Sequence, residues 1–336
     1  MREPAFWHRP RSWQSRLLSP LSMLYGAVAA RRMARPGIKA GVPVICVGNF
    51  HVGGAGKTPT VLALTGLLRE LGEQPVVLSR GYGGRLRGPV QVDPAAHEAA
   101  DVGDEPLMMA SRVPVVVARN RVEGIGLAKA RGASVIVMDD GFQNPSITKD
   151  LALIVIDSAR GLGNSEVFPA GPLRAPLPPQ LARADALVVI GRGHASDAVA
   201  SRMRASGKPV LSAELQPDAA VIAALAGRPL LAFAGIGDPA RFFRTLRSSG
   251  LEVKGERAFP DHHPFTADEI ASLTEQARRQ GLTMVTTEKD LARLGGSKSG
   301  RPDLDITAFP VTLQFSDFSA LRAFVAQRLS ATRQRQ

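Results

Sequence analysis

The stretch VGNFHVGGAGKTPTVLAL, residues 47–64, decides the fold. A short apolar run at 42–47 leads into it and predicts a buried strand, and residues 59–71 read as a helix. Between them, three glycines are followed by Lys57-Thr58. A glycine-rich turn from strand to helix lets backbone N–H groups surround phosphate oxygens, and the helix N-terminus adds partial positive charge. The stretch therefore predicts a phosphate-binding loop.

The residue types of this loop predict how it handles a nucleotide. Lys57 is expected to reach the β- and γ-phosphates of ATP, and Thr58 to bind Mg²⁺. His51 stands where the pattern G-x-x-x-x-G-K-[ST] has its first glycine, which serves turn geometry more than chemistry, so Gly53 and Gly54 are expected to replace it. The alternative, a turn without a ligand, is disfavoured by the intact Gly-Lys-Thr. The predicted ATP-binding residues are His51, Val52, Gly53, Gly54, Ala55, Gly56, Lys57 and Thr58.

Apolar runs of strand length alternate with segments of helix length, which predicts an α/β fold: a P-loop NTPase-like, mostly parallel sheet with helices on both faces. The expected strands are 42–47, 76–79, 113–118, 135–138, 151–156 and 186–190, and the expected helices include 59–71 and 121–131. The Gly- and Pro-rich stretch 161–179 predicts a long functional loop.

A second, smaller α/β domain is expected from residue 217 onward. Its predicted strands are 230–234, 283–287 and 306–313, and its predicted helices are 240–249 and 266–280. The chain is thus divided into an N-terminal region, 1–40, a P-loop kinase domain, 41–216, and a C-terminal α/β domain, 217–336.

The N-terminal region predicts an amphipathic helix that lies on a membrane. Through residue 40 it holds eight Arg or Lys and one acid, together with both tryptophans. Ser19-Pro20 is interpreted as an N-cap with proline at the first helical position. Apolar residues then share one face: Leu17, Leu21, Leu24 and Val28. The run is too short to span a bilayer, so an interfacial position is favoured over simple docking on the domain and over a signal peptide.

Composition limits the classes of partner and compartment. The 336 residues carry a net charge of +12, with a pI near 10.7, which favours anionic partners: nucleic acid, phosphorylated substrates or an acidic membrane. Cys46 is the single cysteine, so no disulfide forms within the chain, and no Cys/His spacing indicates zinc. A reducing compartment is expected.

Carboxylates follow one of the expected strands. Residues 135–138 lead into Asp139-Asp140, and the carboxyl ends of strands are where α/β sheets bind ligands. Alone, this would be an acidic turn; beside a phosphate loop it predicts a Mg²⁺ site formed by Thr58, Asp139 and Asp140.

Three further stretches each have an ordinary structural interpretation when taken alone. They are Ser79-Arg-Gly-Tyr-Gly-Gly84, Val102-Gly-Asp-Glu-Pro106 and Phe259-Pro-Asp-His-His-Pro-Phe265. Separately they would be a hairpin turn, a helix N-cap at Asp104 and a polar loop with locally bonded histidines.

Together these stretches resemble one family, the tetraacyldisaccharide 4'-kinases, which are the lipid A 4'-kinases of Gram-negative bacteria. In that family a non-glycine residue commonly stands where His51 is. The likeness also includes Pro20-Leu-Ser22 with Tyr25, Gly48-Asn49, Gly53–Pro59, Asp139–Gln143, Pro169–Arg174 and Thr287-Glu-Lys-Asp290. The resemblance implies a membrane-associated kinase on the cytoplasmic face of the bacterial inner membrane, with two α/β domains. It implies transfer of the ATP γ-phosphate to the 4'-hydroxyl of a tetraacyl glucosamine disaccharide 1-phosphate, giving lipid IVA.

Site residues carried over from the family are expectations. Asp104 matches the catalytic base and His262 the histidine paired with it, and with Lys57 they form the expected catalytic set. Where the family usually has Glu, this chain has Ala175, and His263 adjoins His262, so the choice of histidine rests on the alignment at Asp261. The expected substrate-binding residues are Arg80, Tyr82, Gly83, Glu105 and Arg174.

The expected partners are the acylated disaccharide lipid and the anionic inner-membrane surface, without nucleic acid and without an obligate protein partner. Three alternatives stay open. A GTPase would typically need [NT]-K-x-D, and Thr287-Glu-Lys-Asp290 has its lysine one position late. A nucleic-acid ATPase fits the charge, but no nucleic-acid module is recognised. A lipid-binding protein with a relic loop would transfer no phosphate.

Overall fold

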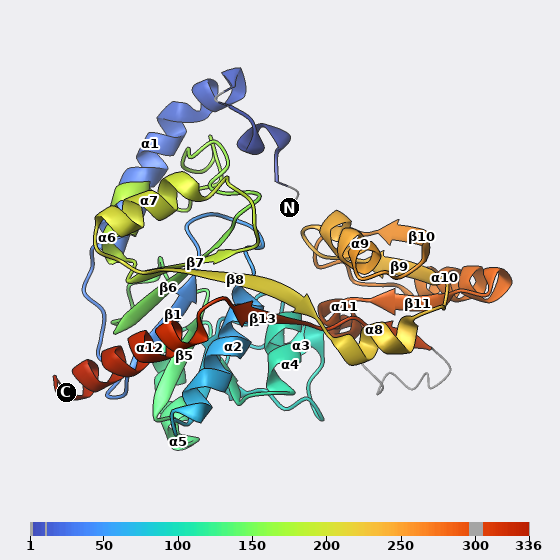
Figure 1. Ribbon diagram of the computed structural model, residues 1–336. Coiled ribbons are helices and arrows are strands. Elements are labelled where there is room, and N and C mark those ends of the chain that lie inside the picture. The colour runs from blue at the N-terminus through green and yellow to red at the C-terminus, as the bar shows by residue number, and fades with distance from the viewer. Residues whose placement is uncertain (1–2, 11, 296–304, 336) are drawn as a thin grey trace.

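The computed structural model describes residues 3–10, 12–295 and 305–335, and a nine-stranded sheet forms its larger unit (Figure 1). The strand order is β13-β8-β7-β6-β1-β5-β2-β4-β3; neighbours from β8 to β4 are parallel, and the two edge strands are antiparallel. The strands are β1 (Val44–Gly48), β2 (Pro75–Ser79), β3 (Val90–Gln91), β4 (Val115–Val117), β5 (Val135–Asp139), β6 (Leu151–Asp157), β7 (Ala186–Ile190), β8 (Val210–Pro217) and β13 (Val311–Phe315).

Helices cover both faces of this sheet because its strands are apolar on both sides. Ile45 and Val47 point into one core and Val44 and Cys46 into the other, as the period of two in a strand requires. The first core is covered by α2 (Lys57–Glu70), α3 (Ala99–Val102), α4 (Asp104–Ala110) and α12 (Phe318–Arg333). The second is covered by α5 (Arg121–Ala130), α6 (Leu177–Arg183) and α7 (Asp197–Ala205). The predicted fold class is confirmed.

The smaller unit is a four-stranded parallel sheet in the order β10-β9-β11-β12, with helices on both faces. Its strands are β9 (Leu230–Ala234), β10 (Val253–Ala258), β11 (Thr283–Thr286) and β12 (Ile306–Ala308). Its helices are α8 (Ala219–Leu225), α9 (Pro239–Ser248), α10 (Ala267–Gln280) and α11 (Glu288–Arg293). Helix α10 begins with the capping box that Thr266 and Glu269 form.

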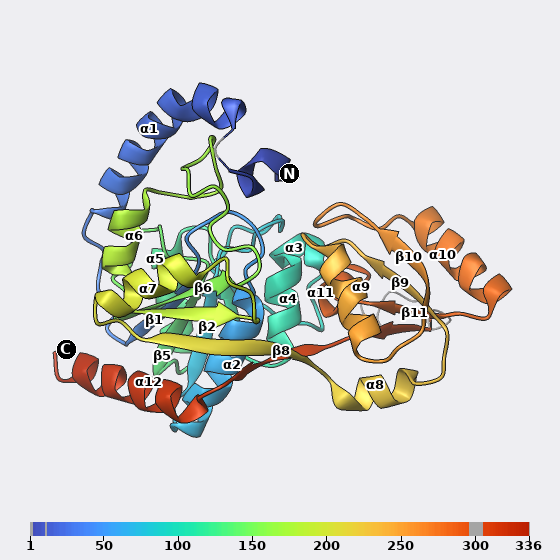
Figure 2. The ribbon, with the colours of Figure 1, turned by 45° about the horizontal axis from the view of Figure 1, so that its top comes forward.

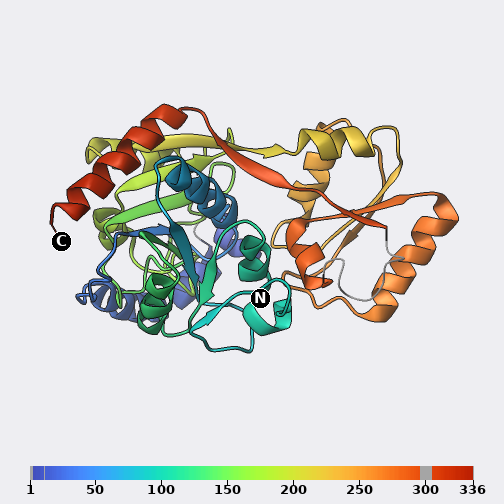
Figure 3. The same cartoon turned by 90° about the horizontal axis from the view of Figure 1, so that it is seen from below.

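The single strand predicted at 306–313 was wrong. It is two strands, β12 in the small sheet and β13 in the large one, where β13 pairs antiparallel with β8. Leu321, Val325 and Leu329 of α12 then join the core of the large unit. Residues 311–333 therefore pack with the larger unit, whereas the predicted division at 217 assigned them to the C-terminal domain. Paired β8 and β13 connect the two units, as seen from below in Figure 3.

Helix α1 (Trp13–Met33) extends along the outside of the large unit after the short 3₁₀ helix η1 (Ala5–His8) (Figure 1). The predicted start at Ser19-Pro20 was wrong. Ser12 is the N-cap, accepting from Ser15 N, and Pro20 lies inside the helix. Proline there removes one helical hydrogen bond, and its ring lies on the exposed side of the helix, where it displaces no packed neighbour.

The two units meet through α11, which packs against α3 and α4 (Figure 2). Helix α4 begins at Asp104, and its second residue, Glu105, interacts by charge with Lys57 of the phosphate loop. Helix α11 follows strand β11 of the smaller sheet. Residues of the two units are thereby brought together next to the carboxyl ends of the large sheet.

Candidate active site

The loop between β1 and α2 has the backbone that its glycines predict. Gly53 and Gly56 have φ values of +103° and +86°, a region that favours glycine, and Gly56 is the residue before the first turn of α2. Thr58 is buried and Lys57 half-buried in that turn. Backbone N–H groups, a lysine and a hydroxyl thus gather at a helix N-terminus, as an anion site requires.

His51 has a structural part in this loop. Its ring is buried, its Nδ1 lies 2.8 Å from the carbonyl oxygen of Val52, and its own carbonyl accepts from Arg174 Nε at 3.1 Å. Burial lowers the pKa of His51 to about 4, so the ring is neutral at pH 7. The side chain is packed inside the protein, and the positive φ angles of the loop belong to Gly53 and Gly56, not to Gly54, which was expected to share this role.

The two acids at the carboxyl end of β5, Asp139 within the strand and Asp140 just after it, have opposite environments. Ser79 Oγ donates to Asp139 Oδ2 at 3.1 Å, and burial, with the nearby charges of Glu105 and Asp140, raises the pKa of Asp139 to about 7. Asp140 accepts two hydrogen bonds from Arg174, at 2.8 and 3.0 Å, and lies 3.8 Å from Lys57 Nζ.

Burial alone would raise the pKa of Asp140, but the charges of Lys57 and Arg174 lower it to about 2. Arg121 donates to the carbonyls of both Asp139 and Asp140, each at 3.1 Å, and so fixes the backbone of this turn.

Asp139 is the better fitted of the two acids to a metal ion. Its Oδ1 is buried and has no hydrogen-bond partner within residues 3–10, 12–295 and 305–335. In that same part of the chain, no group of three or more His, Cys, Asp or Glu is placed to hold a metal. A Mg²⁺ ion would therefore be held by Asp139 and the Thr58 hydroxyl together with phosphate oxygens of a nucleotide, a donor set that the hard cation accepts. Asp140 is already paired with Arg174.

Asp104 and His262 come together from different units. His262 Nδ1 lies 3.0 Å from Asp104 Oδ2, and Asp104 is 5% exposed. Gly103, with φ +91°, brings the chain into α4, and a Cβ there would clash with the carbonyl of Tyr82. Arg293 donates from Nε to the same Oδ2 at 2.8 Å.

Burial would raise the pKa of Asp104, but the hydrogen bonds and charges of His262 and Arg293 hold it well below its usual range. The hydrogen bond with Asp104 in turn raises the pKa of His262. The neighbouring histidine is engaged elsewhere, because His263 Nε2 lies 2.9 Å from Glu269 within the smaller unit. Of the two histidines, His262 is therefore the one that contacts Asp104.

The predicted substrate-binding residues are only partly gathered. Tyr82 is 71% exposed and its ring centroid lies 5.5 Å from that of His262, whereas Arg80 is exposed and Gly83 faces open space. Glu105 forms an ion pair with Lys289 of α11, and Arg174 is bound to Asp140. Ala175, where the family pattern has an acid, is fully buried.

Sequence reasoning missed several charged residues at this site. Lys289 and Arg293 reach the large unit from α11. Lys289 lies in the stretch 287–290, which was used as a family motif and against a GTPase without a site role for the lysine, and Arg293 lies beyond that stretch. Glu3 lies against Gly53, where a Cβ would clash with its carboxylate, and Glu3 pairs with Arg160 and His8. No local pattern in the sequence places Glu3 at the phosphate loop.

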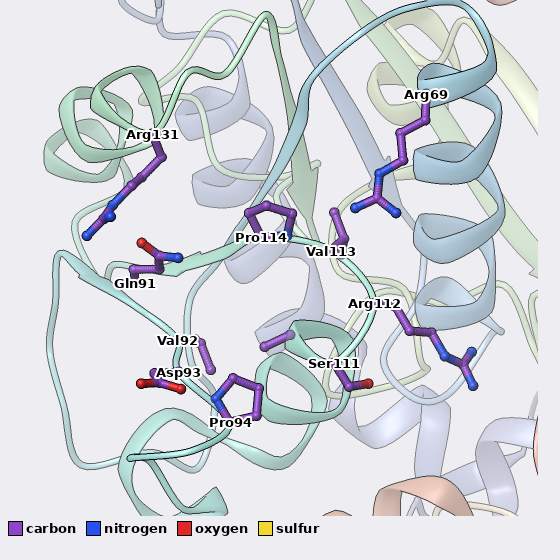
Figure 4. Close-up of a pocket in the computed structure, with 11 residues that line it drawn as sticks. Arg69, Gln91, Val92, Asp93, Pro94, Ser111, Arg112, Val113, Pro114 and Arg131 are labelled. Carbon is purple, nitrogen blue, oxygen red and sulfur yellow. The ribbon is translucent and has the colours of Figure 1, made fainter.

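A separate cavity of about 630 Å³ lies at the other end of the large sheet (Figure 4). It is lined by Val113 and Pro114, which precede β4, and by Gln91 on the edge strand. Arg69, at the end of α2, and Arg131, which follows α5, also line it. It is thus remote from the carboxyl ends of the strands and contains none of the predicted site residues.

A phosphate loop at the carboxyl end of β1, with two acids at the carboxyl end of β5, defines the chain as a P-loop nucleotide-binding protein. The model of the tetraacyldisaccharide-1-P 4'-kinase family matches residues 14–330. The chain belongs to that family, which confirms the resemblance seen in the sequence, and it is an enzyme of the kinase class.

Related proteins match this chain over nearly its whole length. The chain is 77% identical to tetraacyldisaccharide 4'-kinase of Bradyrhizobium sp. strain BTAi1, with 100% of this chain and 98% of that one covered. It is 65% identical to that of Nitrobacter hamburgensis, covering 99% and 100%. Among solved structures it is similar to LpxK from Aquifex aeolicus, described as an "apo" form in complex with ATP, with a TM-score of 0.72, 28% identity, and 94% and 99% of the two chains covered.

Proposed function

We propose that this protein transfers the γ-phosphate of ATP to the 4'-hydroxyl of a tetraacyl glucosamine disaccharide 1-phosphate, forming lipid IVA in lipid A biosynthesis. The observation that carries the proposal is the Asp104–His262 pair, held 3.0 Å apart, beside Glu105, whose charge interacts with Lys57 of the phosphate loop. A phosphate loop alone serves many hydrolases and switches. A buried carboxylate paired with a histidine from a second unit adds the means to take a proton from an acceptor hydroxyl.

ATP is proposed to bind at residues 51–58. The backbone N–H groups of Gly54, Ala55 and Gly56 would surround the phosphates, and Lys57 would leave its 3.8 Å contact with Asp140 to neutralise charge on the transferred group. Mg²⁺, held by Thr58 and Asp139, supplies charge neutralisation at the phosphate oxygens when bound. The bidentate hold of Arg174 on Asp140 keeps that acid in place when Lys57 turns to the nucleotide.

Asp104 is proposed as the general base. The 4'-hydroxyl oxygen attacks the γ-phosphorus, the bond from phosphorus to the β-bridging oxygen of ATP breaks, and the hydroxyl proton passes to Asp104. A carboxylate with a lowered pKa is a weak base at rest, but the acidity of the hydroxyl rises as its bond to phosphorus forms, so transfer becomes favourable late in the step. His262, whose pKa is raised by the same pair, keeps the carboxylate turned toward the acceptor.

Helix α1 is proposed to bring the site to the cytoplasmic face of the bacterial inner membrane, where the lipid substrate lies. Its face toward the protein is small and polar: Ser15 donates to the carbonyl of Ala170, and Ser22 accepts from Ala170 N. Its outer face is apolar and exposed, with Trp13, Leu17, Leu21, Met23, Leu24 and Val28 between 59% and 74% exposed.

This arrangement is the reverse of an ordinary surface helix and favours contact with lipid. Arg16, Arg31, Arg32 and Arg35 on or just after the helix are exposed and would meet anionic headgroups. In the described part of the chain, no helix combines the length and the apolar character that crossing a membrane requires.

The test is a direct assay of phosphate transfer. Purified protein with ATP-Mg²⁺ and the detergent-dispersed disaccharide 1-phosphate should give a bisphosphorylated lipid, with one ADP formed for each product. The Lys57→Ala variant serves as the matched control for contaminating kinases. Release of ADP without phosphorylated lipid, or equal activity with GTP and no lipid product, would overturn the proposal.

A further inference from the structure

Arg293 belongs to the smaller unit, and its guanidinium ends at the carboxylate of Asp104. It is the last residue of α11, and its side chain is 8% exposed. Nε donates to Asp104 Oδ2 at 2.8 Å; Nη1 donates to the carbonyl of Gly235 at 2.9 Å and to Asp290 Oδ1 at 2.7 Å. Three fixed acceptors on a planar donor leave the guanidinium little freedom.

Arg293 does not need Asp104 as a counter-charge. Asp290 is fully buried beside it, and its position is fixed by hydrogen bonds from Gly235 N at 3.1 Å and from Thr287 Oγ1 at 2.6 Å. A buried guanidinium requires a paired and hydrogen-bonded acid, and the smaller unit supplies one by itself. The additional hydrogen bond to Asp104 therefore acts on the carboxylate of the larger unit.

That carboxylate is held on both oxygens. Asp104 Oδ1 accepts from the backbone N–H of Glu105 at 2.9 Å, and Oδ2 accepts from Arg293 and from His262 Nδ1. Donors on both sides resist rotation of the carboxylate about its Cβ–Cγ bond. Each carboxylate oxygen has two lone pairs, so the hydrogen bonds seen among the described residues leave one lone pair, on Oδ1, to receive a proton.

The charged groups that interact with Asp104 come from three segments packed around it. They are Glu105 on α4, His262 after β10, and Lys289, Asp290 and Arg293 on α11, while Asp261 acts on His262. Arg293 is charged at every working pH, whereas His262 loses its proton as pH rises. Arg293 therefore supplies the lasting positive charge at this carboxylate.

We propose that Arg293 is a positioning residue for Asp104, which it holds across the contact between the two units with the free lone pair of Oδ1 available to the acceptor hydroxyl. The inference rests on the proposed role of Asp104 as base. It also gives a use to the stretch 287–293: Thr287 and Asp290 fix the guanidinium, and the guanidinium fixes the base.

The test compares Arg293→Gln and Arg293→Lys with Arg112→Gln. Arg112 is the matched control because it forms an ion pair with Glu288 of the same helix, also across the two units, but does not touch Asp104. We expect Arg293→Gln to lower kcat about 100-fold with the KM for ATP within threefold, Arg293→Lys to lower kcat less, and Arg112→Gln to retain wild-type kcat. The Arg293→Gln defect should be greater at pH 8, where His262 is losing its proton, than at pH 6, where the charged His262 still partners Asp104. A kcat within threefold of wild type, or an equal loss in Arg112→Gln, overturns the inference.

Two further measurements keep the test decisive. Arg293→Gln leaves Asp290 buried without its cation, so the Asp290→Asn/Arg293→Gln double variant is assayed as well; a folded double variant with near wild-type kcat overturns the inference. Titration of His262 by NMR is independent of kinase activity. Because Arg293 lowers the pKa of His262 by charge repulsion, that pKa should rise in Arg293→Gln and stay unchanged in Arg112→Gln. If the pKa of His262 is unchanged in Arg293→Gln, Arg293 does not act at the Asp104–His262 pair and the inference is overturned. If the wild-type protein phosphorylates no lipid, the proposed function is overturned instead.

Discussion

Asp104 and His262 are 158 residues apart in the chain, yet Oδ2 of one and Nδ1 of the other lie 3.0 Å apart. Each comes from a special backbone position: Asp104 follows Gly103 with φ +91°, and His262 itself has φ +57°. A non-glycine residue in that region is strained, and such strain is found where a side chain must be aimed. The contact therefore has the geometry of a functional pair.

Asp104 and His262 are expected to act as one unit in phosphate transfer. Asp104→Asn should lower kcat by about 10³-fold or more, since it removes the proton acceptor, and His262→Ala should lower it less. The double variant should be little worse than Asp104→Asn, because the second change removes help that no longer has a recipient. Steady-state kinetics on the four proteins measure the coupling. Losses that multiply would show that His262 has a separate role, and a larger loss in His263→Ala would show that the wrong histidine was chosen.

The same pair predicts how stability changes with pH. The pKa of Asp104 is lowered by folding, so its contribution is present above the unfolded value, near 4, and is lost in acid. The pKa of His262 is raised, so its contribution is present below about 6.5 and is lost as pH rises through the folded value. Wild type should therefore exceed Asp104→Asn in free energy of unfolding most strongly between about pH 4 and 6.5.

Denaturant unfolding of both proteins at pH 5.5 and pH 8.5 tests this window. The difference should shrink at pH 8.5 without vanishing, because Arg293 still contacts Asp104 there. A difference that grows with pH would contradict the assigned protonation of the pair.

Lys57 is expected to act by charge and not by packing. Its side chain lies 3.8 Å from Asp140 in a half-buried position, so Lys57→Ala should leave the melting temperature within a few degrees of wild type. Phosphate-stabilising cations contribute strongly in the transition state, so kcat/KM should fall about 10³-fold or more. The control is Lys39→Ala, an exposed lysine outside the loop. A folded Lys57→Ala protein with turnover near wild type would exclude the loop from the mechanism.

The sequence predicted the large sheet because its evidence is local. Continuous apolar runs such as 151–156 predict strands that are buried on both faces. Gly56-Lys57-Thr58 marks the start of α2. Strand β8, which lies between β13 and β7, was missed because it is only partly buried and carries polar residues, among them Glu214 and Gln216. The return of β13 to the first sheet is a long-range pairing, and no local pattern indicates which sheet a short strand will join.

The candidate site shows the same limit. Asp104 and His262 were expected from a resemblance, and the structure brings them together, but their catalytic roles stay predictions. Arg293 was not singled out, since its meaning depends on α11 packing against α4. Pro20 misled the prediction of α1, because proline is usually a first-turn residue and here lies mid-helix on an exposed surface.

The two faces of helix α1 allow its packing on the protein to be tested separately from its binding to a membrane. Its exposed stripe of Leu17, Leu21, Leu24 and Val28 is 59% to 71% exposed, so replacing all four with Gln should leave the melting temperature nearly unchanged. Burying each such side chain is worth about 1.5–3 kcal/mol at most, so the quadruple variant should lose several kcal/mol of affinity for lipid. Removing the whole segment would be a poorer experiment, because it also deletes the buried Trp7 and the contacts of Ser15 and Ser22.

The quadruple variant should no longer cosediment with vesicles containing anionic lipid, and its apparent KM for vesicle-borne disaccharide 1-phosphate should rise at least tenfold. Its KM for ATP and its kcat on detergent-dispersed lipid should stay within twofold, since the phosphate loop is untouched. Ser22→Ala is the matched control on the opposite face: it removes the acceptor for Ala170 N, so it should lower the melting temperature while vesicle binding persists. If the quadruple variant instead melts several degrees lower and still binds vesicles, then α1 packs on the protein in solution and another surface meets the membrane.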